Sequence, residues 1–346
     1  MNYGSRKTQK PFIIPVFLPH AGCPHRCVFC DQAAITGESA SLPSPESLCN
    51  QVNAFIDFKS KNRKGVQIAF YGGNFLGLAE EAVKTLLTGA AAFVQSGQVD
   101  SIRFSTRPDT IDAVRLSWLK AFPVGTIELG VQSMDDAVLA RSNRGHTARD
   151  TENAVALLKK HSYQIGLQLM LGLPGDDEVR AVKSSEKAAA LSPDFVRIYP
   201  TVVLKNSPLA RLFQKGKYEP LSLEAAVSLA KKLYRIFESL AIPVIRMGLQ
   251  ASEDLDAGAD ILAGPYHPAF GQLVYGELFL DRARSQLRHS EIRTGSITFQ
   301  VHPRSLSRLQ GIRNRNIQTL KKEFGFHSIA IVADKSLAEN ELKLSL

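Results

Sequence analysis

Short apolar segments alternate with longer amphipathic ones from residue 11 to about residue 250. The short segments are rich in Val, Ile, Phe and Tyr, and the longer ones repeat apolar residues near the 3.6-residue period of a helix. This alternation is typical of βα units around a parallel sheet, so it predicts an α/β fold, a full or partial (β/α) TIM-like barrel. Strands are expected at Phe12–Leu18, Gln67–Tyr71, Ser101–Thr106, Thr126–Val131, Gln164–Leu171, Phe195–Val203 and Val244–Leu249. Helices are expected between them, for example at Glu80–Val94, Thr151–His161, Glu178–Leu191 and Leu223–Leu240.

The rest of the chain predicts two further parts. A Gly- and Pro-bearing link and a helical segment occupy residues 251–290, after a barrel core at residues 1–250. Residues 291–346 have the order strand, two short helices, strand, which predicts a small α+β module with strands at Ser296–His302 and Ser328–Ala333.

Composition excludes several classes of protein. The chain has 346 residues, of which 44% are hydrophobic and 22% charged, as expected for a folded domain rather than a disordered one. No apolar run approaches the ~18 residues that span a bilayer, and Met1–Lys10 is polar and basic. We therefore expect no membrane segment and a cytoplasmic location. Four cysteines, three of them crowded together, exclude a disulfide scaffold.

The crowded cysteines form the run Cys23-Pro-His-Arg-Cys27-Val-Phe-Cys30, directly after the first expected strand. In a TIM-like barrel the chemistry lies at the carboxyl ends of the strands, so a site is expected there. A 4Fe-4S cubane is closed by four thiolates. Three cysteines would hold three irons and leave the fourth open to a substrate or cofactor ligand.

Zinc is the competing metal. The three cysteines and either His20 or His25 would make a tetrahedral site of three sulfurs and one nitrogen. Structural zinc sites usually draw their ligands from two separated pairs, and the sequence has no second pair. The iron-sulfur interpretation is therefore favoured. Buried free cysteines are favoured least, because His25 and Arg26 make the loop polar.

The cysteine triplet, with Phe29 before its last member, resembles the signature of the radical S-adenosylmethionine (SAM) superfamily. The resemblance implies that Cys23, Cys27 and Cys30 hold the cluster as its catalytic ligands, with Phe29 beside the cofactor. It implies that SAM chelates the open iron and is cleaved reductively to a 5′-deoxyadenosyl radical, which no ordinary side chain could supply. It further implies an oxygen-sensitive enzyme with a low-potential electron donor of the flavodoxin or ferredoxin type.

Residues after the second strand and in the third extend this resemblance. Gly72-Gly73-Asn74 resembles a Gly-Gly motif whose carbonyls receive the SAM ammonium, and glycine permits the close backbone approach that this contact needs. Asn74 stands where many superfamily members carry Glu, and Ser105 stands where related enzymes carry an acidic residue. All four positions are expected to border the cofactor.

A narrower resemblance, over roughly residues 11–250, is to the radical SAM part of the Elongator catalytic subunit and, more distantly, to oxygen-independent coproporphyrinogen III oxidase. It rests on the stretches Phe70–Gly77, Ser105–Asp109, Glu128–Ser133 and Arg144–Thr147. The resemblance implies SAM contacts from Gln132, from Gln168 near the ribose, and from Arg144 as the carboxylate partner, a role that suits its bidentate fork. Alternatively, both Gln side chains are satisfied inside the barrel, and Arg144 pairs with Asp135 or Asp136.

Positive charge is concentrated near the C-terminus. The formal charge is +9, and Arg282–Lys322 holds ten Lys or Arg against the single acid Glu291. Such a segment attracts polyanions. Gly311–Asn314 also resembles the Gly-x-x-Gly loop of a KH-like module, with Asn in place of the second Gly. Against a plain packing or dimerisation module, the sequence predicts nucleic-acid contacts at Arg304, Arg308, Arg313, Arg315, Lys321 and Lys322.

Three functions remain open from the sequence. The first is a radical SAM enzyme acting on RNA, specifically tRNA, since the Elongator relatives modify the wobble uridine. Their acetyl-CoA step is not expected, because the chain ends at Leu346 without room for that domain. The second is a radical SAM enzyme acting on a small molecule. The third is a non-catalytic protein that binds metal and nucleic acid.

Overall fold

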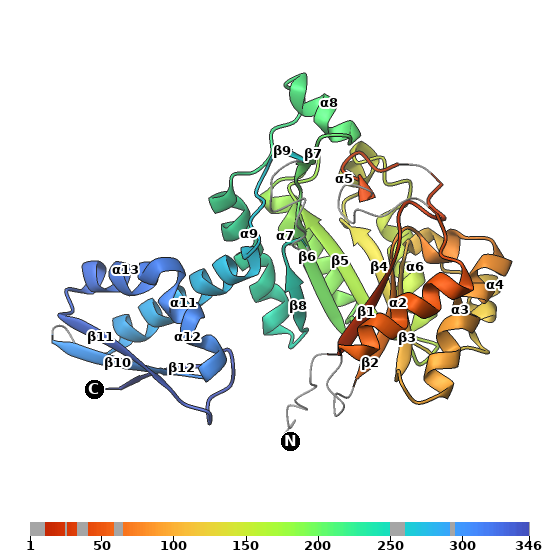
Figure 1. The fold of residues 1–346 in the computed structure, drawn as a ribbon. Coiled ribbons are helices and arrows are strands. Elements are labelled where there is room, and N and C mark those ends of the chain that lie inside the picture. The colour runs from red at the N-terminus through yellow and green to blue at the C-terminus, as the bar shows by residue number, and fades with distance from the viewer. Residues whose placement is uncertain are drawn as a thin grey trace.

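A curled parallel sheet with helices on its outer side forms the larger body of the molecule in this computed structural model (Figure 1). The structure describes residues 11–24, 26–32, 41–58, 65–249, 260–290 and 295–345. Its seven-stranded sheet has the order β1-β2-β3-β4-β5-β6-β8. The strands are β1 (Phe12–Leu18), β2 (Val66–Gly72), β3 (Ser101–Thr106), β4 (Val124–Gln132), β5 (Gln164–Leu171), β6 (Phe195–Pro200) and β8 (Val244–Met247).

Helices connect these strands, because parallel neighbours need a long crossover. They are α2 (Pro45–Asp57), α3 (Glu80–Gln95), α4 (Ala113–Leu119), α5 (Asp136–Arg141), α6 (Ala148–Leu158), α7 (Glu178–Ala190), α8 (Pro208–Gln214) and α9 (Leu223–Ser239). The sheet has β1 and β8 as its edges and does not close. The predicted partial TIM-like barrel is therefore confirmed. Within the described residues, no helix has both the length and the apolar character needed to cross a membrane.

Two elements of the barrel have a boundary three residues from the predicted one, and the other barrel elements differ by two residues at most. The sixth strand ends at Pro200 and not at Val203, since proline lacks the N–H that would continue the ladder. Beyond it, β7 (Val203–Leu204) pairs antiparallel with β9 (Ile261–Ala263), apart from the main sheet. Helix α6 starts before the predicted Thr151, because Thr147 caps its first turn in a capping box with Asp150.

The two faces of the sheet differ in character. In β5, Leu167, Leu169 and Leu171 are buried in the main hydrophobic core. Gln168 and Met170 alternate with them and are only partly buried. Because successive strand residues point to opposite faces, the helix-covered face is apolar and the concave face is left to polar side chains.

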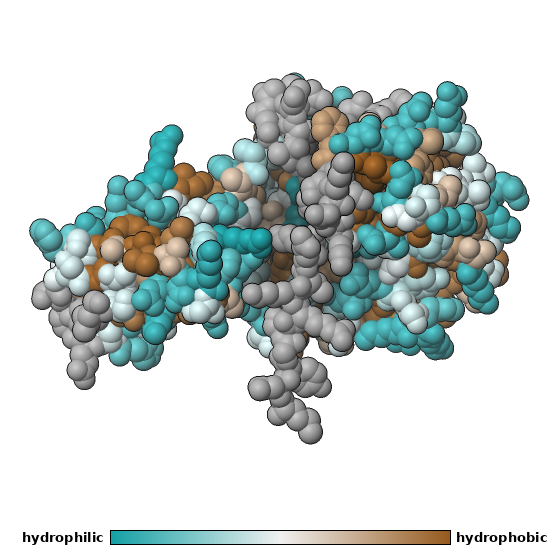
Figure 2. Space-filling model, turned by 60° about the horizontal axis from the view of Figure 1, so that its bottom comes forward, coloured by the Kyte–Doolittle hydropathy of each residue, from teal (hydrophilic) through white to brown (hydrophobic). Residues whose placement is uncertain are grey.

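A smaller body follows helix α11 (Phe270–His289), at the left of Figure 1. It has the order β10 (Ser296–Val301), α12 (Leu306–Gln310), α13 (Arg315–Phe324), β11 (Ser328–Ala333) and β12 (Leu342–Ser345). Strand β10 lies centrally, parallel to β11 and antiparallel to β12. Helix α11 joins the two bodies, since Val274 packs in the barrel core and Phe279 in the core of the smaller body. Figure 2 shows apolar and polar residues side by side on the surface of this body.

Candidate cofactor site

A pocket of about 140 Å³ lies at the carboxyl ends of β1 to β5. The predicted cofactor residues that line it are Cys23, Cys27, Phe29, Cys30, Gly72, Gly73, Ser105, Gln132, Arg144 and Gln168. Asn74 is the predicted cofactor residue that does not line it. Sequence reasoning assigned no SAM contact to six further lining residues: His20, Arg26, Gln32, Thr106, Arg107 and Gly130.

The three cysteines of the pocket are free thiols. Burial raises the pKa of Cys23, and burial together with the neighbouring Cys27 and Cys23 raises the pKa of Cys30 to about 12. Crowded, buried thiols of this kind stay protonated unless a cation stabilises the thiolate form. No three His, Cys, Asp or Glu side chains among the described residues converge on a single metal ion. His25 lies outside the described residues.

The glycines after β2 hold the cysteine loop against the strand end. A Cβ at Gly73 would lie 2.1 Å from the Ala21 carbonyl oxygen, so only glycine fits. The Gly73 N–H donates to the Leu18 carbonyl at 2.9 Å. Gln32 Nε2 donates to the Gly72 carbonyl, whose oxygen retains a second lone pair. The end of β2 is thus closely packed against the cysteine loop and has backbone carbonyl groups at the wall of the pocket.

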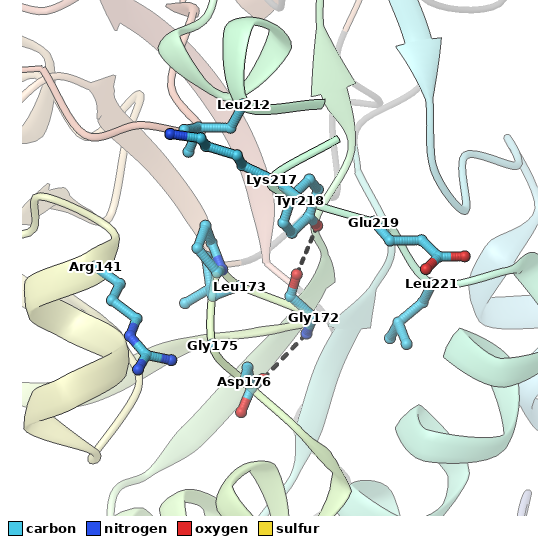
Figure 3. Close-up of a pocket in the computed structure, with 11 residues that line it drawn as sticks. Arg141, Gly172, Leu173, Gly175, Asp176, Leu212, Lys217, Tyr218, Glu219 and Leu221 are labelled. Carbon is cyan, nitrogen blue, oxygen red and sulfur yellow. Dashed lines mark hydrogen bonds between the residues drawn. The ribbon is translucent and has the colours of Figure 1, made fainter. Parts of the chain in front are cut away.

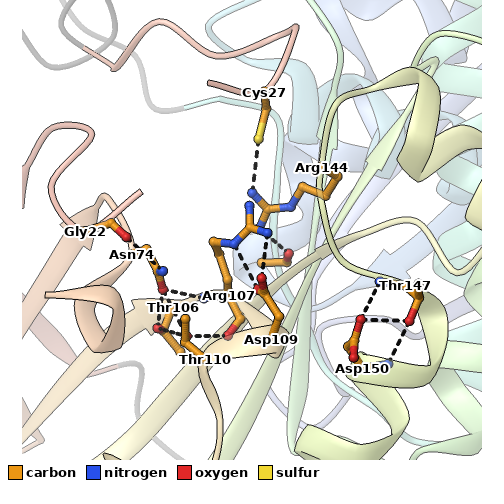
Figure 4. Close-up of polar contacts among 11 residues, drawn as sticks. Gly22, Cys27, Asn74, Thr106, Arg107, Asp109, Thr110, Arg144, Thr147 and Asp150 are labelled. Atoms are coloured by element: carbon orange, nitrogen blue, oxygen red, sulfur yellow. Dashed lines mark hydrogen bonds and ion pairs between the residues drawn. The ribbon is translucent and has the colours of Figure 1, made fainter. Parts of the chain in front are cut away.

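The side chain of Asn74 forms hydrogen bonds with other residues of the protein. Its side chain is buried, and Nδ2 donates to the Gly22 carbonyl at 3.1 Å. Its Oδ1 accepts from Thr106 Oγ1 at 2.7 Å and from the Arg107 N–H at 3.0 Å (Figure 4). The amide therefore ties the cysteine loop to the end of β3.

Arg144 reaches the cysteine loop from beyond β4. Its Nη1 lies 3.3 Å from Cys27 Sγ, and Nη2 donates to the Gly130 carbonyl at 2.5 Å (Figure 4). Its Nε is buried and has no hydrogen-bond partner within the described part of the chain. A buried guanidinium with an unused donor is suited to an anionic ligand.

The alternative pairing of Arg144 with its neighbours in sequence is wrong. Asp135 forms an ion pair with Arg180 at 3.1 Å. Asp136 accepts from the Ala148 N–H at 2.7 Å, at the start of α6.

Gln132 occupies a distorted strand end. The register between β4 and β5 shifts between Gly130 and Gln132, and Gln132 has a φ of 67°. A bulge of this kind re-aims a side chain, and positive φ in a residue other than glycine is concentrated at functional sites. Gln132 Oε1 is buried with no partner among the described residues. An unused acceptor is thereby placed in the pocket wall.

The amino-acid sequence is similar to known protein families and to known proteins. The Radical SAM superfamily matches residues 17–187, and the Radical SAM C-terminal domain matches residues 193–279. An uncharacterised protein of Methanocaldococcus jannaschii is 30% identical over 233 residues, which are 64% of this chain and 70% of that protein. The chain belongs to the radical SAM superfamily. It is therefore a radical SAM enzyme, of a family that uses SAM and an iron-sulfur cluster, and the non-catalytic alternative falls away.

This radical SAM enzyme is also similar to two proteins of the Elongator type. The tRNA uridine(34) acetyltransferase of Dehalococcoides mccartyi is 24% identical over 279 residues, 66% of this chain and 59% of that protein. The solved structure of Elp3 from Methanocaldococcus infernus superposes with a TM-score of 0.61 at 20% identity, covering 80% of this chain and 63% of the other. The chain thus spans about three fifths of these two relatives, and the structural match establishes a shared fold.

The carboxylate of Glu128 lies next to the pocket residue Gln168, and the sequence analysis did not predict a role for it. Glu128 on β4 is fully buried. Its Oε1 accepts from Tyr71 OH at 2.9 Å, and its Oε2 accepts from Gln168 Nε2 at 3.1 Å and lies 2.7 Å from Arg197 Nε. Gln168 therefore lines the pocket while its amide nitrogen is hydrogen-bonded to Glu128. The available signal was that Glu128 is the only acid in the seven strands of the sheet.

A second, larger cavity of about 520 Å³ lies beyond the end of β5 (Figure 3). Tyr218 OH donates to the Gly172 carbonyl at 2.6 Å, and the Gly172 N–H donates to Asp176 Oδ2 at 3.1 Å. Asp176 Oδ1 is buried without a hydrogen-bond partner in the described structure, and burial raises the pKa of this carboxyl to about 6. None of the predicted cofactor residues lines this cavity.

The predicted nucleic-acid residues fall into two groups. Arg304 and Arg308 form ion pairs with Glu339 at 2.8 and 3.5 Å, and Arg308 stacks over the Tyr275 ring at 4.3 Å. Arg313, Arg315 and Lys322 are exposed and Lys321 is partly exposed, with no ion pair to any described residue. Asn314, at the predicted loop, has the left-handed φ of 61° that its residue type tolerates.

Proposed function

We propose that the chain binds a 4Fe-4S cluster through Cys23, Cys27 and Cys30, cleaves SAM reductively beside it, and modifies an RNA base, with tRNA as the substrate. The observation that carries the proposal is the convergence of three free thiols, a Gly-Gly strand end and the Arg144 guanidinium on one pocket. A flavodoxin or ferredoxin in the cytoplasm would supply the electron.

The residues of the pocket fit these groups. Burial, with a smaller contribution from the neighbouring thiols, raises the pKa of Cys23 and Cys30, so their thiolate forms would be stabilised by a bound iron cation. The unused Nε donor of Arg144 suits the SAM carboxylate, and the unused Oε1 acceptor of Gln132 suits a hydroxyl or ammonium. When bound, the cluster and SAM supply a 5′-deoxyadenosyl radical that abstracts hydrogen from a substrate or adds to it.

The RNA substrate is supported by two observations. Relatives include proteins named tRNA uridine(34) acetyltransferase and Elongator complex protein 3. The exposed cations Arg313, Arg315 and Lys322 lie together on and before α13, where they can meet phosphates. A small-molecule substrate is the second candidate. It is favoured by the ion pairs of Arg304 and Arg308 with Glu339, which reduce the positive field of the smaller body.

The test is release of 5′-deoxyadenosine from SAM by anaerobically reconstituted, reduced protein, with and without bulk tRNA. We expect release in the wild type, stimulation by tRNA, and loss of both in Cys30→Ala. Cys49→Ala is the matched control, because Cys49 is exposed on α2 and does not line the pocket.

The outcomes separate the parts of the proposal. Release that is indifferent to tRNA would remove the RNA substrate and leave the small-molecule one. No release from repeated iron-replete preparations would contradict the cofactor chemistry itself.

A further inference from the structure

The strands of the half-barrel carry an unusual excess of positive charge. The strands contain three arginines, Arg103 on β3, Arg197 on β6 and Arg246 on β8. Their single acid is Glu128 on β4. Bulky apolar side chains normally fill the interior of such a barrel. Two positive charges in excess of the negative one therefore need a physical reason.

Strand pairing places these side chains on the concave face, beside the cofactor pocket. Gln168 is in register with Gly130 on one side and with Arg197 on the other, and Arg197 is in register with Arg246. Residues in register share a face of the sheet. Gln168, Arg197 and Arg246 thus form a row across three strands. Because Gln168 lines the pocket, this row begins at the cofactor site and ends at β8, the edge strand.

Glu128 cannot neutralise the whole row. Its carboxylate lies 2.7 Å from Arg197 Nε and 3.4 Å from Arg103 Nη1. Arg246 has no carboxylate within 4.0 Å among the described residues, and it donates to the backbone carbonyls of Gly248 and Leu249 at 3.2 and 3.1 Å. Burial and the nearby charge of Arg197 lower the pKa of Arg246, although a guanidinium stays protonated in proteins.

The row is accessible to a ligand from the concave side. Arg246, Tyr199 and Tyr71 are partly exposed, and the Arg197 side chain is 12% exposed. Arg197 Nη1 lies 3.5 Å from Tyr199 OH, so a hydroxyl accompanies the guanidinium groups, whereas the Tyr71 hydroxyl already donates to Glu128 at 2.9 Å. Several N–H and O–H donors around excess positive charge match a tetrahedral oxyanion.

We propose that Arg246 and Arg197 bind a phosphate of the substrate next to the cofactor pocket. The inference rests on the proposed function, because an RNA substrate brings a phosphate at each nucleotide. It identifies the group by which the target nucleotide is held, while the cations of α13 hold more distant parts of the RNA. Arg103 and Glu128 position Arg197 and do not touch the phosphate.

The test compares Arg246→Gln, Arg246→Lys and Arg149→Gln, the last removing one charge from an exposed arginine of α6. Two probes are used on the anaerobically reconstituted protein. Radiolabelled inorganic phosphate is measured by equilibrium dialysis, and a fluorescent single-stranded oligoribonucleotide is titrated at several salt concentrations. We expect Arg246→Gln to weaken phosphate binding about tenfold and to flatten the salt slope of RNA binding by about 0.7. Arg246→Lys should retain most of both, and Arg149→Gln should change neither.

The outcomes distinguish this site from the RNA proposal. Phosphate binding that depends on Arg246, in a protein that does not bind the oligonucleotide, would sustain the site and point to a small phosphorylated substrate. Phosphate binding and a salt slope that are both the same in Arg246→Gln as in the wild type would overturn the proposal. Thermal unfolding of each variant checks that the comparison is made on folded protein.

Discussion

The half-barrel and the smaller C-terminal body both carry clustered arginines, but they treat the charge in opposite ways. In the half-barrel, Arg103 is buried and the Arg197 side chain is only 12% exposed, and both contact the buried Glu128. In the smaller body, arginines lie at the surface, where Glu339 and Glu323 from other segments pair with some of them. An arginine thus belongs to a largely buried network around a fully buried acid in one region and pairs with a solvent-exposed acid in the other. Its contribution to stability and to binding should differ accordingly.

The largest expected difference is in stability. Glu128→Gln should lower the free energy of unfolding by about 3–5 kcal/mol, because it removes the one carboxylate that compensates Arg103 and Arg197 in the interior. Urea unfolding, followed by circular dichroism, measures the change.

Glu339→Gln is the matched control in the smaller body. It removes the same charge from two arginines, but the Glu339 side chain is 41% exposed. Exposed ion pairs contribute at most about 1 kcal/mol, so this variant should unfold close to the wild type. Equal losses in the two variants would show that the two regions do not differ as the burial of their acids indicates.

The next effect concerns RNA affinity. Arg313→Gln combined with Arg315→Gln should weaken tRNA binding about tenfold at moderate salt, since neither guanidinium is paired with a described acid. Arg304→Gln combined with Arg308→Gln should weaken it less, because Glu339 already neutralises part of their charge. Fluorescence titration at two salt concentrations measures both. The reverse order would place the RNA on the Glu339 side of the body.

Most of the fold was predictable because buried parallel strands read as separate apolar runs. Strands β1, β3 and β5 have the predicted bounds. The ribbon of β7 and β9 was not predictable, since strands of two and three residues have no measurable periodicity. The pocket could be anticipated because its residues follow strand ends, where a barrel collects them.

The concave face could not be anticipated in the same way. Glu128, Arg197 and Arg246 are each the single charged residue of a mainly apolar strand, a pattern that equally suits a solvent-exposed face. Only the curl of the sheet and its register bring them into one row. Conversely, the pairing of Arg304 and Arg308 with Glu339 joins residues far apart in sequence, so charge counting overstated their availability.

The last comparison concerns a second, partly buried carboxylate of the barrel region, Asp176. Asp176 differs from Glu128 because its Oδ1 has no partner among the described residues, and burial raises its pKa to about 6. A carboxyl whose folded pKa lies above its unfolded value, about 3.9, destabilises the fold above pH 6 and ceases to do so as the pH falls through this window. Asp176→Asn keeps an acceptor for the Gly172 N–H and places an uncharged amide nitrogen where Oδ1 lacks a partner. At pH 8 the variant should therefore be more stable than the wild type by about 2 kcal/mol, and the advantage should shrink toward pH 4.5. Urea unfolding at both values measures this, and a difference that does not change with pH would show that Asp176 is ionised without cost.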